Sequence, residues 1–147
     1  MVAGSIPVPK NNFTITIAVT SIKTLLSFIE PEFMFIEGQG SVLHPAYPGS
    51  FEIIGAAKPD AIILQHAPGR VDYDGFDGIR IPPLEKYIKV LELLSDRKVI
   101  GISLNREGLM ENDIPETLKK ITRETGIYAF DPLGDLSGMV DLILKLS

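Results

Sequence analysis

Side chains capable of acid–base chemistry or metal binding gather in one short segment, residues 37–47, which follows an apolar run. That run, residues 33–36 (FMFI), ends at Glu37, and Gly38 and Gly40 bracket a glutamine just beyond it. Glycines leave backbone N–H groups accessible to an anion. A carboxylate beside such amides could bind Mg²⁺ directly or through water, or act as a general base. In the alternative interpretation, Glu37 only accepts hydrogen bonds from the amides of its own turn.

The same segment continues with residues that could hold a ligand or move a proton. The predicted ligand-binding residues of this segment are Gly38, Gln39, Gly40, Ser41 and Tyr47. His44 and His66 are the two histidines of the chain, and we predict proton transfer or ligand binding for both. Alternatively, each is an ordinary hydrogen-bonding loop residue. A serine hydrolase is disfavoured, because Ser41 and His44 have no third partner at the spacing of a nucleophile elbow.

Two later segments carry further candidates. His66 opens the sequence HAPGR, in which Arg70 could fork onto a phosphate or a carboxylate. The alternative for Arg70 is a surface ion pair with Asp72 or Asp74. Asn105 ends another apolar run, where its amide could hydrogen-bond a nucleotide base or a ligand amide. The alternative for Asn105 is capping of a helix.

Short apolar runs predict the strands that position these residues. The predicted strands cover residues 13–19, 33–36, 61–65, 99–104 and 127–130. Three of them end at Glu37, His66 and Asn105. Because parallel strands bring their carboxyl ends to one edge of a sheet, and ligands of open α/β sheets bind there, we expect these three residues to converge.

Helical periodicity alternates with the strands and predicts an α/β fold. The predicted helices cover residues 21–29, 51–57, 83–94, 113–126 and a last segment after 135, which is expected to bury Leu136, Met139, Val140, Ile143 and Leu144. The expected architecture is a three-layer, mostly parallel sheet with helices on both faces. Residues 71–82 are predicted to form a long functional or mobile loop. Its aspartates do not fit an EF-hand, because Pro83 occupies the position of the bidentate carboxylate.

Composition limits the classes of function. The chain has 147 residues, a net charge of −5, no cysteine and no Lys/Arg cluster. A disulfide framework, a thiolate zinc site and a cysteine nucleophile are therefore excluded, and nucleic acid is not an expected partner. No apolar run approaches the roughly 20 residues that span a bilayer, and residues 1–12 lack the features of a signal peptide. We therefore predict a cytoplasmic protein that binds a small anionic molecule and no membrane.

Four motifs in one order, EGQGS (37–41), HPAY (44–47), HAPGR (66–70) and GISLN (101–105), carry a family resemblance. The chain resembles the carboxyl-terminal part of D-glutamate N-acetyltransferase-like proteins. The resemblance implies a P-loop NTPase-like fold similar to dethiobiotin synthetase, with Glu37 near Mg²⁺ and Asn105 near an adenine. It also implies acetyl transfer from acetyl-CoA to D-glutamate, with acetyl-CoA or ATP with Mg²⁺ as the cofactor.

The chain departs from that family in length and in one motif. Family members are much longer, and no GxxxxGK[ST] sequence occurs in this chain. We therefore expect residues 1–147 to form a single domain that lacks the Walker A half, as a fragment or as the product of a split gene. Such a chain is expected to be inactive alone and to need the amino-terminal half or a second copy as a partner. The alternative is a non-catalytic, P-loop-like regulatory module that self-associates as a dimer.

Overall fold

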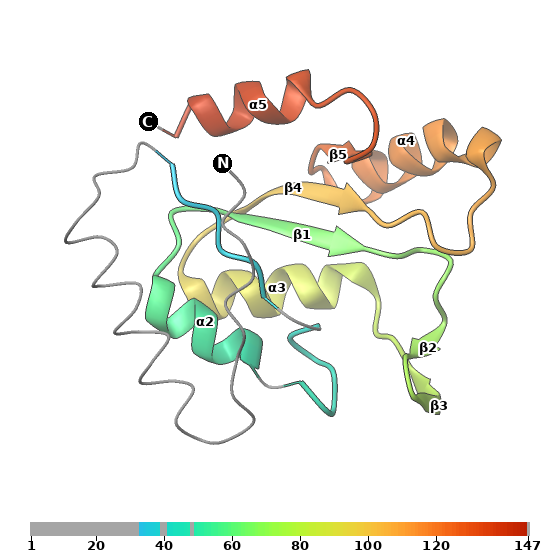
Figure 1. The fold of residues 1–147 in the computed structure, drawn as a ribbon, viewed down its shortest axis with the longest axis horizontal. Coiled ribbons are helices and arrows are strands. Elements are labelled where there is room, and N and C mark those ends of the chain that lie inside the picture. The colour runs from blue at the N-terminus through green and yellow to red at the C-terminus, as the bar shows by residue number, and fades with distance from the viewer. Residues whose placement is uncertain (1–32, 39–40, 48, 147) are drawn as a thin grey trace. The chain divides into compact units, whose positions relative to one another are not determined.

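The structure, a computed structural model, describes residues 33–38, 41–47 and 49–146 (Figure 1). The chain divides into two compact units, residues 1–59 and 60–147, and each is described by itself. The strand and helix predicted at 13–19 and 21–29 lie outside the described residues. No helix in the described part of the chain is long and apolar enough to cross a membrane.

The described part of the first unit contains a turn over residues 41–47 and helix α2 (Gly49–Ala57). This helix confirms the prediction for residues 51–57. Lys58 follows the helix with a left-handed backbone (φ 46°), and its amide donates to the carbonyl of Ile54 at 3.1 Å. Pro59 follows and prevents the helix from continuing.

The apolar run at residues 33–36 differs from its prediction. Residues 33–38 have no regular secondary structure, and the side chains of residues 33–36 are between 36% and 64% exposed. The predicted strand, buried on both sides, is therefore wrong for this structure. An apolar run becomes a buried strand only where neighbouring strands satisfy its backbone groups, and such neighbours are not encoded in the run itself.

The second unit is built on a parallel sheet with strand order β1-β4-β5. Its strands are β1 (Ile62–His66), β4 (Val99–Leu104) and β5 (Ala129–Phe130). All three were expected from the apolar runs, and the predicted parallel α/β fold is confirmed. The register pairs the last residue of β1, His66, with the last residue of β4, Leu104.

Helices cover this sheet. Helix α3 (Leu84–Ser95) contacts β1 and β4, and helix α4 (Ile114–Thr125) contacts β5. The last helix is α5 (Ser137–Leu144). A short 3₁₀ turn, Glu111–Asp113, precedes α4. Asp113 and Glu116 have the spacing of a capping box, but Asp113 makes no side-chain cap bond. Helix α4 ends at Gly126, whose left-handed backbone (φ 72°) terminates it.

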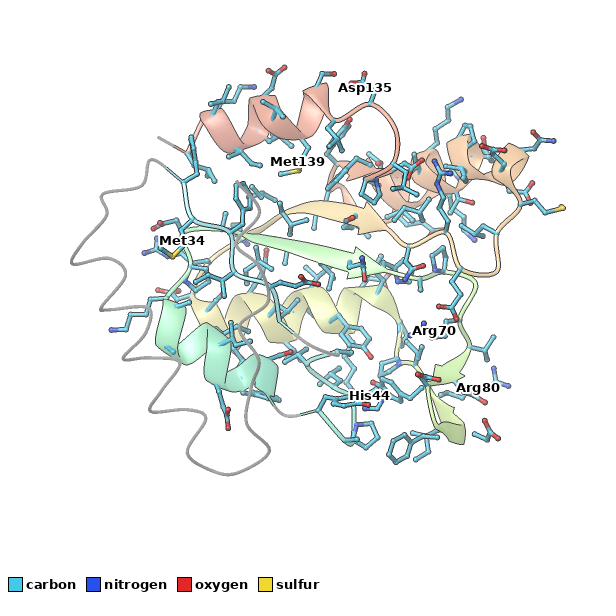
Figure 2. All side chains as sticks on the ribbon, viewed as in Figure 1. Met34, His44, Arg70, Arg80, Asp135 and Met139 are labelled. Atoms are coloured by element: carbon cyan, nitrogen blue, oxygen red, sulfur yellow. The ribbon has the colours of Figure 1, made fainter. Side chains whose placement is uncertain are left out.

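The two faces of β4 meet different helices. Ile102 and Leu104 point to one face and form the main core with residues of α4 and β5, which are Ile114, Ile121 and Ala129. Gly101 points to the opposite face, where a Cβ would lie 2.7 Å from the sulfur of Met139. Met139 reaches the sheet from α5 (Figure 2). Because successive side chains of β4 point to opposite faces of the sheet, α3 and α4 pack on one face and α5 packs on the other.

Residues 71–82 form a β-hairpin where a long loop was predicted. Strand β2 (Asp72–Tyr73) pairs antiparallel with β3 (Phe76–Arg80). The turn residue Gly75 has a positive φ of 74°. An Asp-Gly pair between short strands is a known hairpin signal, so the sequence contained the evidence for this element.

Helix α5 buries less than its periodicity suggested. Met139 is buried, as predicted, but Leu136, Val140 and Leu144 are exposed. Helical periodicity marks an apolar face without showing how much of it a narrow sheet can cover. The prediction that all five apolar residues are buried is therefore wrong.

Candidate functional site

Two turns lie together at the carboxyl edge of the second unit's sheet, one after β1 and one after β4. The amide of Asn105 donates to the carbonyl of His66 at 2.7 Å, which extends the pairing of the strands into the turns. The turn after β1 is closed by the amide of Arg70, which donates to Ala67 at 3.1 Å. The expected convergence of His66 and Asn105 is therefore present. Glu37 belongs to the other unit and is described separately.

A close backbone approach joins these turns. A Cβ on Gly69 would overlap the carbonyl oxygen of Glu107 and lie 3.1 Å from the Cα of Gly108. Gly108 itself has a left-handed backbone with φ 73°. Glycine is therefore needed at position 69 for space and is favoured at position 108 for conformation.

Arg70 is held by a partner that sequence proximity did not suggest. Its guanidinium pairs with the carboxylate of Glu107, with Nε donating to Oε1 at 3.2 Å. The hydrogen bond raises the pKa of Arg70 and lowers the pKa of the Glu107 carboxyl. Among the described residues, neither Asp72 nor Asp74 forms an ion pair with Arg70. The two turns are thus joined by side chains as well as by backbone.

The side chain of Asn105 is used within its own turn. Its Oδ1 accepts a hydrogen bond from the amide of Glu107 at 2.9 Å. This is an Asx-type turn, in which a side chain replaces a backbone acceptor. Asn105 therefore does not cap a helix, since the next helical element begins only at Glu111, and its side-chain amide nitrogen is not used by the turn bond.

A third polar residue, Asp131, occupies the same edge directly after β5. It accepts hydrogen bonds from Arg106 Nε at 3.1 Å to each carboxylate oxygen, and only 11% of its side chain is exposed. Arg106 lowers the pKa of the Asp131 carboxyl. Asp131 directly follows the apolar run at 127–130, and this is the same signal that marked His66 and Asn105.

Acid is expected to weaken the fold through this pair. Because the folded-state pKa of Asp131 lies below its unfolded value of about 4, its stabilisation is fully present above that pH. It is lost as the pH falls through the folded-state pKa. In urea unfolding at pH 6 and pH 3, Asp131→Asn should therefore lose less stability on acidification than the unchanged chain. The exposed hairpin variant Asp77→Asn is the control, and equal acid sensitivity of the two variants would contradict the prediction.

His66 is half-buried at the end of β1. Burial lowers the pKa of His66, while the nearby carboxylate of Glu85 opposes that shift. A histidine with a lowered pKa is uncharged near neutral pH. Its imidazole can therefore accept a proton from a bound group.

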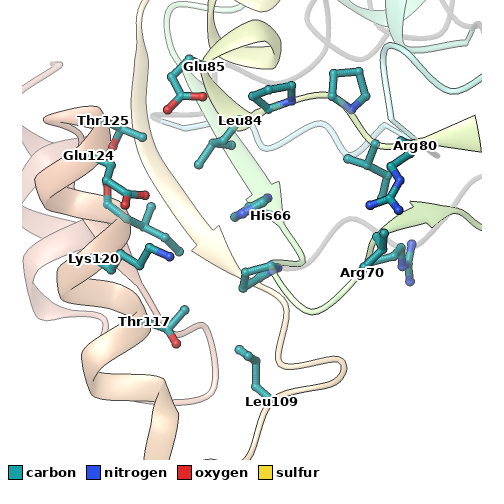
Figure 3. Close-up of a pocket in the computed structure, with 16 residues that line it drawn as sticks. His66, Arg70, Arg80, Leu84, Glu85, Leu109, Thr117, Lys120, Glu124 and Thr125 are labelled. Carbon is teal, nitrogen blue, oxygen red and sulfur yellow. Dashed lines mark hydrogen bonds between the residues drawn. The ribbon is translucent and has the colours of Figure 1, made fainter.

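His66 also lines a cavity of about 470 Å³ in the second unit (Figure 3). One wall comes from the turn after β1 and from the base of the hairpin, and includes Pro68, Arg70 and Arg80. The opposite wall is one face of α4, with Thr117, Lys120, Ile121, Glu124 and Thr125. The start of α3 adds Leu84 and Glu85. The volume is in the range of small-molecule sites, although about half of the lining residues are polar or charged.

The sequence predictions omitted Arg80, Lys120 and Glu85. The lining residues at 117, 120, 121, 124 and 125 lie on one face of α4. Because a polar face of a helix usually faces solvent, its sequence did not indicate a cavity wall. Arg80 reaches the cavity because the amide of Ile81 donates to Val71 at 2.9 Å and closes the hairpin base. Only recognition of the hairpin would have placed Arg80 beside Arg70.

The first unit places its candidates around a compact turn. The amide of His44 donates to the carbonyl of Ser41 at 2.9 Å, and the Ser41 hydroxyl accepts from Leu43 at 3.3 Å. His44 Nδ1 accepts from the amide of Ala46 at 3.1 Å, and its ring lies 4.6 Å from that of Tyr47. The bond at Nδ1 leaves the proton of a neutral ring on Nε2.

The other candidates of this unit lie before that turn. Glu37 is exposed, and a Cβ on Gly38 would make ordinary contacts with Ile53 and Ser50 at 3.6 Å. Packing within the unit therefore does not require glycine at position 38. Gln39 and Gly40 lie outside the described residues. No group of three or more acidic or histidine side chains in the described part of the chain is arranged to hold a metal ion.

Comparison with known proteins gives this geometry a family context. The chain is 36% identical over 103 residues to a D-glutamate N-acetyltransferase from Tritonibacter scottomollicae, which covers 66% of this chain and 31% of that protein. It is 31% identical over 112 residues to a D-glutamate N-acetyltransferase from a Pseudoalteromonas species, covering 72% of this chain and 34% of that protein. The chain thus spans about a third of the length of these relatives.

A crystal structure and a family description complete the comparison. The fold is similar to that of a DUF1611 family protein from Anabaena variabilis, with a TM-score of 0.83 and 23% identity over 93% of this chain and 42% of that one. Residues 6–142 match the family described as a domain of unknown function (DUF1611_C), P-loop domain. The predicted resemblance is confirmed, and the chain belongs to the DUF1611 family.

Proposed function

We propose that this chain is the carboxyl-terminal, ligand-binding part of a D-glutamate N-acetyltransferase-like enzyme. The main supporting observation is the joined pair of turns at the sheet edge, with the half-buried His66 on the wall of a cavity. The two relatives are D-glutamate N-acetyltransferases, and the proposed reaction class is theirs. A cytoplasmic location belongs to the proposal, because the reaction needs a compartment that contains acetyl-CoA.

In the proposed reaction, the amino group of D-glutamate attacks the carbonyl carbon of the acetyl thioester. The ammonium first gives one proton to a base, for which His66 is suited because it is uncharged near neutral pH. The C–N bond forms, the C–S bond breaks, and the coenzyme A thiolate leaves. The nitrogen then loses its second proton and the thiolate gains one. The products are N-acetyl-D-glutamate, coenzyme A and one released proton.

The candidates of the first unit are assigned to the same enzyme. We assign His44 to proton transfer or ligand binding, and we assign ligand contacts to Ser41, Tyr47 and the Gly38–Gly40 segment. Mg²⁺ commonly keeps its waters and takes one or two carboxylates together with phosphate oxygens. The exposed carboxylate of Glu37 fits one such position if the bound cofactor is ATP with Mg²⁺. Glu37→Gln should then remove any Mg²⁺-dependent gain in nucleotide binding.

One observation favours a non-catalytic module as the second candidate function. Two predicted ligand-binding side chains make bonds within the described structure, Arg70 to Glu107 and Asn105 to its own turn. A self-associating module that has lost its ligand would use them in this way. The two functions differ in whether a ligand stabilises the fold.

Thermal unfolding with acetyl-CoA, ATP and D-glutamate distinguishes these functions. A ligand present at about 100 times its Kd should raise the Tm by roughly 5–10 °C if it binds only the folded chain. Acetyl transfer is then assayed with the chain alone and with the amino-terminal part of a relative added, and activity is expected only in the mixture. In that mixture, His66→Gln should reduce the rate by about 100-fold. Absence of any Tm shift would favour the module.

A further inference from the structure

The cavity of the second unit carries charges of both signs. Arg70, Arg80 and Lys120 are cationic, and Glu85 and Glu124 are anionic. Figure 3 shows Arg70 and Arg80 on one side of His66, with Lys120 and Glu124 across the cavity on α4. A site for a purely anionic ligand would not need the two carboxylates. The lining therefore suits a ligand that carries both signs of charge.

Arg80 and Lys120 provide the available positive charge. Arg70 is already neutralised by Glu107, which is not part of the cavity wall. Among the described residues, no hydrogen bond or ion pair involves the side chain of Arg80 or Lys120. The two come from different elements, the end of β3 and the middle of α4, so they reach the cavity from different walls.

Glu85 provides negative charge close to the predicted proton acceptor. It lies in the first turn of α3, and its carboxylate acts electrostatically on His66. A cationic group bound near Glu85 would therefore also lie near His66. This arrangement places a binding carboxylate and an uncharged imidazole around the same part of the cavity.

We propose that this cavity binds an amino dicarboxylic acid, with Arg80 and Lys120 holding its two carboxylates and Glu85 holding its ammonium group. The assignment rests on the proposed function for the choice of D-glutamate as the probe. It follows from three matches. Two cations, Arg80 and Lys120, suit two carboxylates, and Glu85 is the one of the two lining carboxylates that acts on His66, so it suits the ammonium. His66 lines the same cavity, where the ammonium must lose a proton.

Calorimetric titration of the full chain with D-glutamate tests the proposal. Arg80→Gln and Lys120→Gln should each raise the Kd by about 10-fold or more, because each removes a charge-assisted contact. Lys119→Gln, next to Lys120 on α4 but not on the cavity wall, is the matched control and should change the Kd less than about twofold. Arg80→Lys keeps the charge and should retain most of the affinity.

Analogues that lack one charged group test the individual contacts. Glutarate lacks the ammonium, and Glu85→Gln should weaken D-glutamate without weakening glutarate. 4-Aminobutanoate and D-2-aminobutanoate each lack one carboxylate, and each should become insensitive to one of the two cation variants. Circular dichroism and thermal melting confirm that every variant is folded before titration.

Three outcomes would overturn the inference. In the first, the unchanged chain does not bind D-glutamate. In the second, Lys120→Gln and Lys119→Gln have equal Kd values. In the third, Arg80→Gln and Lys120→Gln lose coenzyme A binding and keep D-glutamate binding.

A separate acetyl-transfer assay distinguishes the two proposals. D-glutamate binding with the expected variant pattern but no transfer would overturn the proposed function alone. Transfer that Arg80→Gln and Lys120→Gln leave unchanged would overturn this inference alone.

Discussion

Replacing Ile102 with alanine is expected to lower the free energy of unfolding by about 4 kcal/mol, the largest effect we predict for a single substitution. The Ile102 side chain has no exposed surface and lies in the cluster that joins β4 to α4 and β5. Its truncation removes buried apolar area and leaves a cavity, because close-packed neighbours relax only partly. Small domains are stable by roughly 5–15 kcal/mol, so the loss would be a large part of the total.

A graded series measures this effect. Ile102→Val removes one methyl group and should cost about 1 kcal/mol. Leu93→Ala is the control, because the Leu93 side chain is 85% exposed and its truncation should change stability by less than about 0.5 kcal/mol. All variants are compared by urea unfolding. Equal losses for Ile102→Ala and Leu93→Ala would show that the core is not centred on β4.

Replacing Gly69 with alanine is expected to cost about 3 kcal/mol and to disturb the candidate site. The added Cβ would overlap the carbonyl oxygen of Glu107, and backbone atoms cannot rotate away as a flexible side chain can. The turn after β1 would have to move from the turn after β4. Such a movement would separate Arg70 from Glu107 and shift His66, which starts the first of these turns.

Two readouts separate the local effect from a general loss of stability. Urea unfolding gives the cost in free energy, and D-glutamate titration under conditions where the variant is folded gives the effect on the site. Gly55→Ala is the control, because nothing lies within 4 Å of a Cβ at that helical position and alanine is the better helix former. If Gly69→Ala were as stable as Gly55→Ala and bound D-glutamate normally, the close contact of the turns would be contradicted.

Local patterns were sufficient for most elements of the second unit. The apolar runs at 61–65, 99–104 and 127–130 and the helical face at 83–94 lie within one or two residues of the observed elements. Their success has a simple cause, because periodicity and buried apolar runs report on neighbours within the same segment. The same reasoning placed His66 and Asn105 at one edge, since a parallel sheet leaves no other arrangement.

The predictions that failed concern contacts between segments. The hairpin at residues 72–80 depends on a two-residue turn, whereas the prediction for residues 71–82 is a long loop. The exposure of residues 33–36, and of Val140 and Leu144 in α5, depends on what lies beside them. The partner of Arg70, Glu107, is 37 positions away in the sequence, whereas the alternative interpretation paired Arg70 with an aspartate two or four positions away.

The sequence by itself determined the α/β class, the family and the strand ends at which polar residues gather, because these follow from periodicity and from motifs with fixed spacing. The tertiary structure alone decided that Gly69 packs against the turn after β4 and that Arg80, Glu85 and Lys120 line one cavity with His66. These residues come from separate elements. Only strand register, hairpin closure and helix packing determine which side chains from separate elements lie within reach of one ligand.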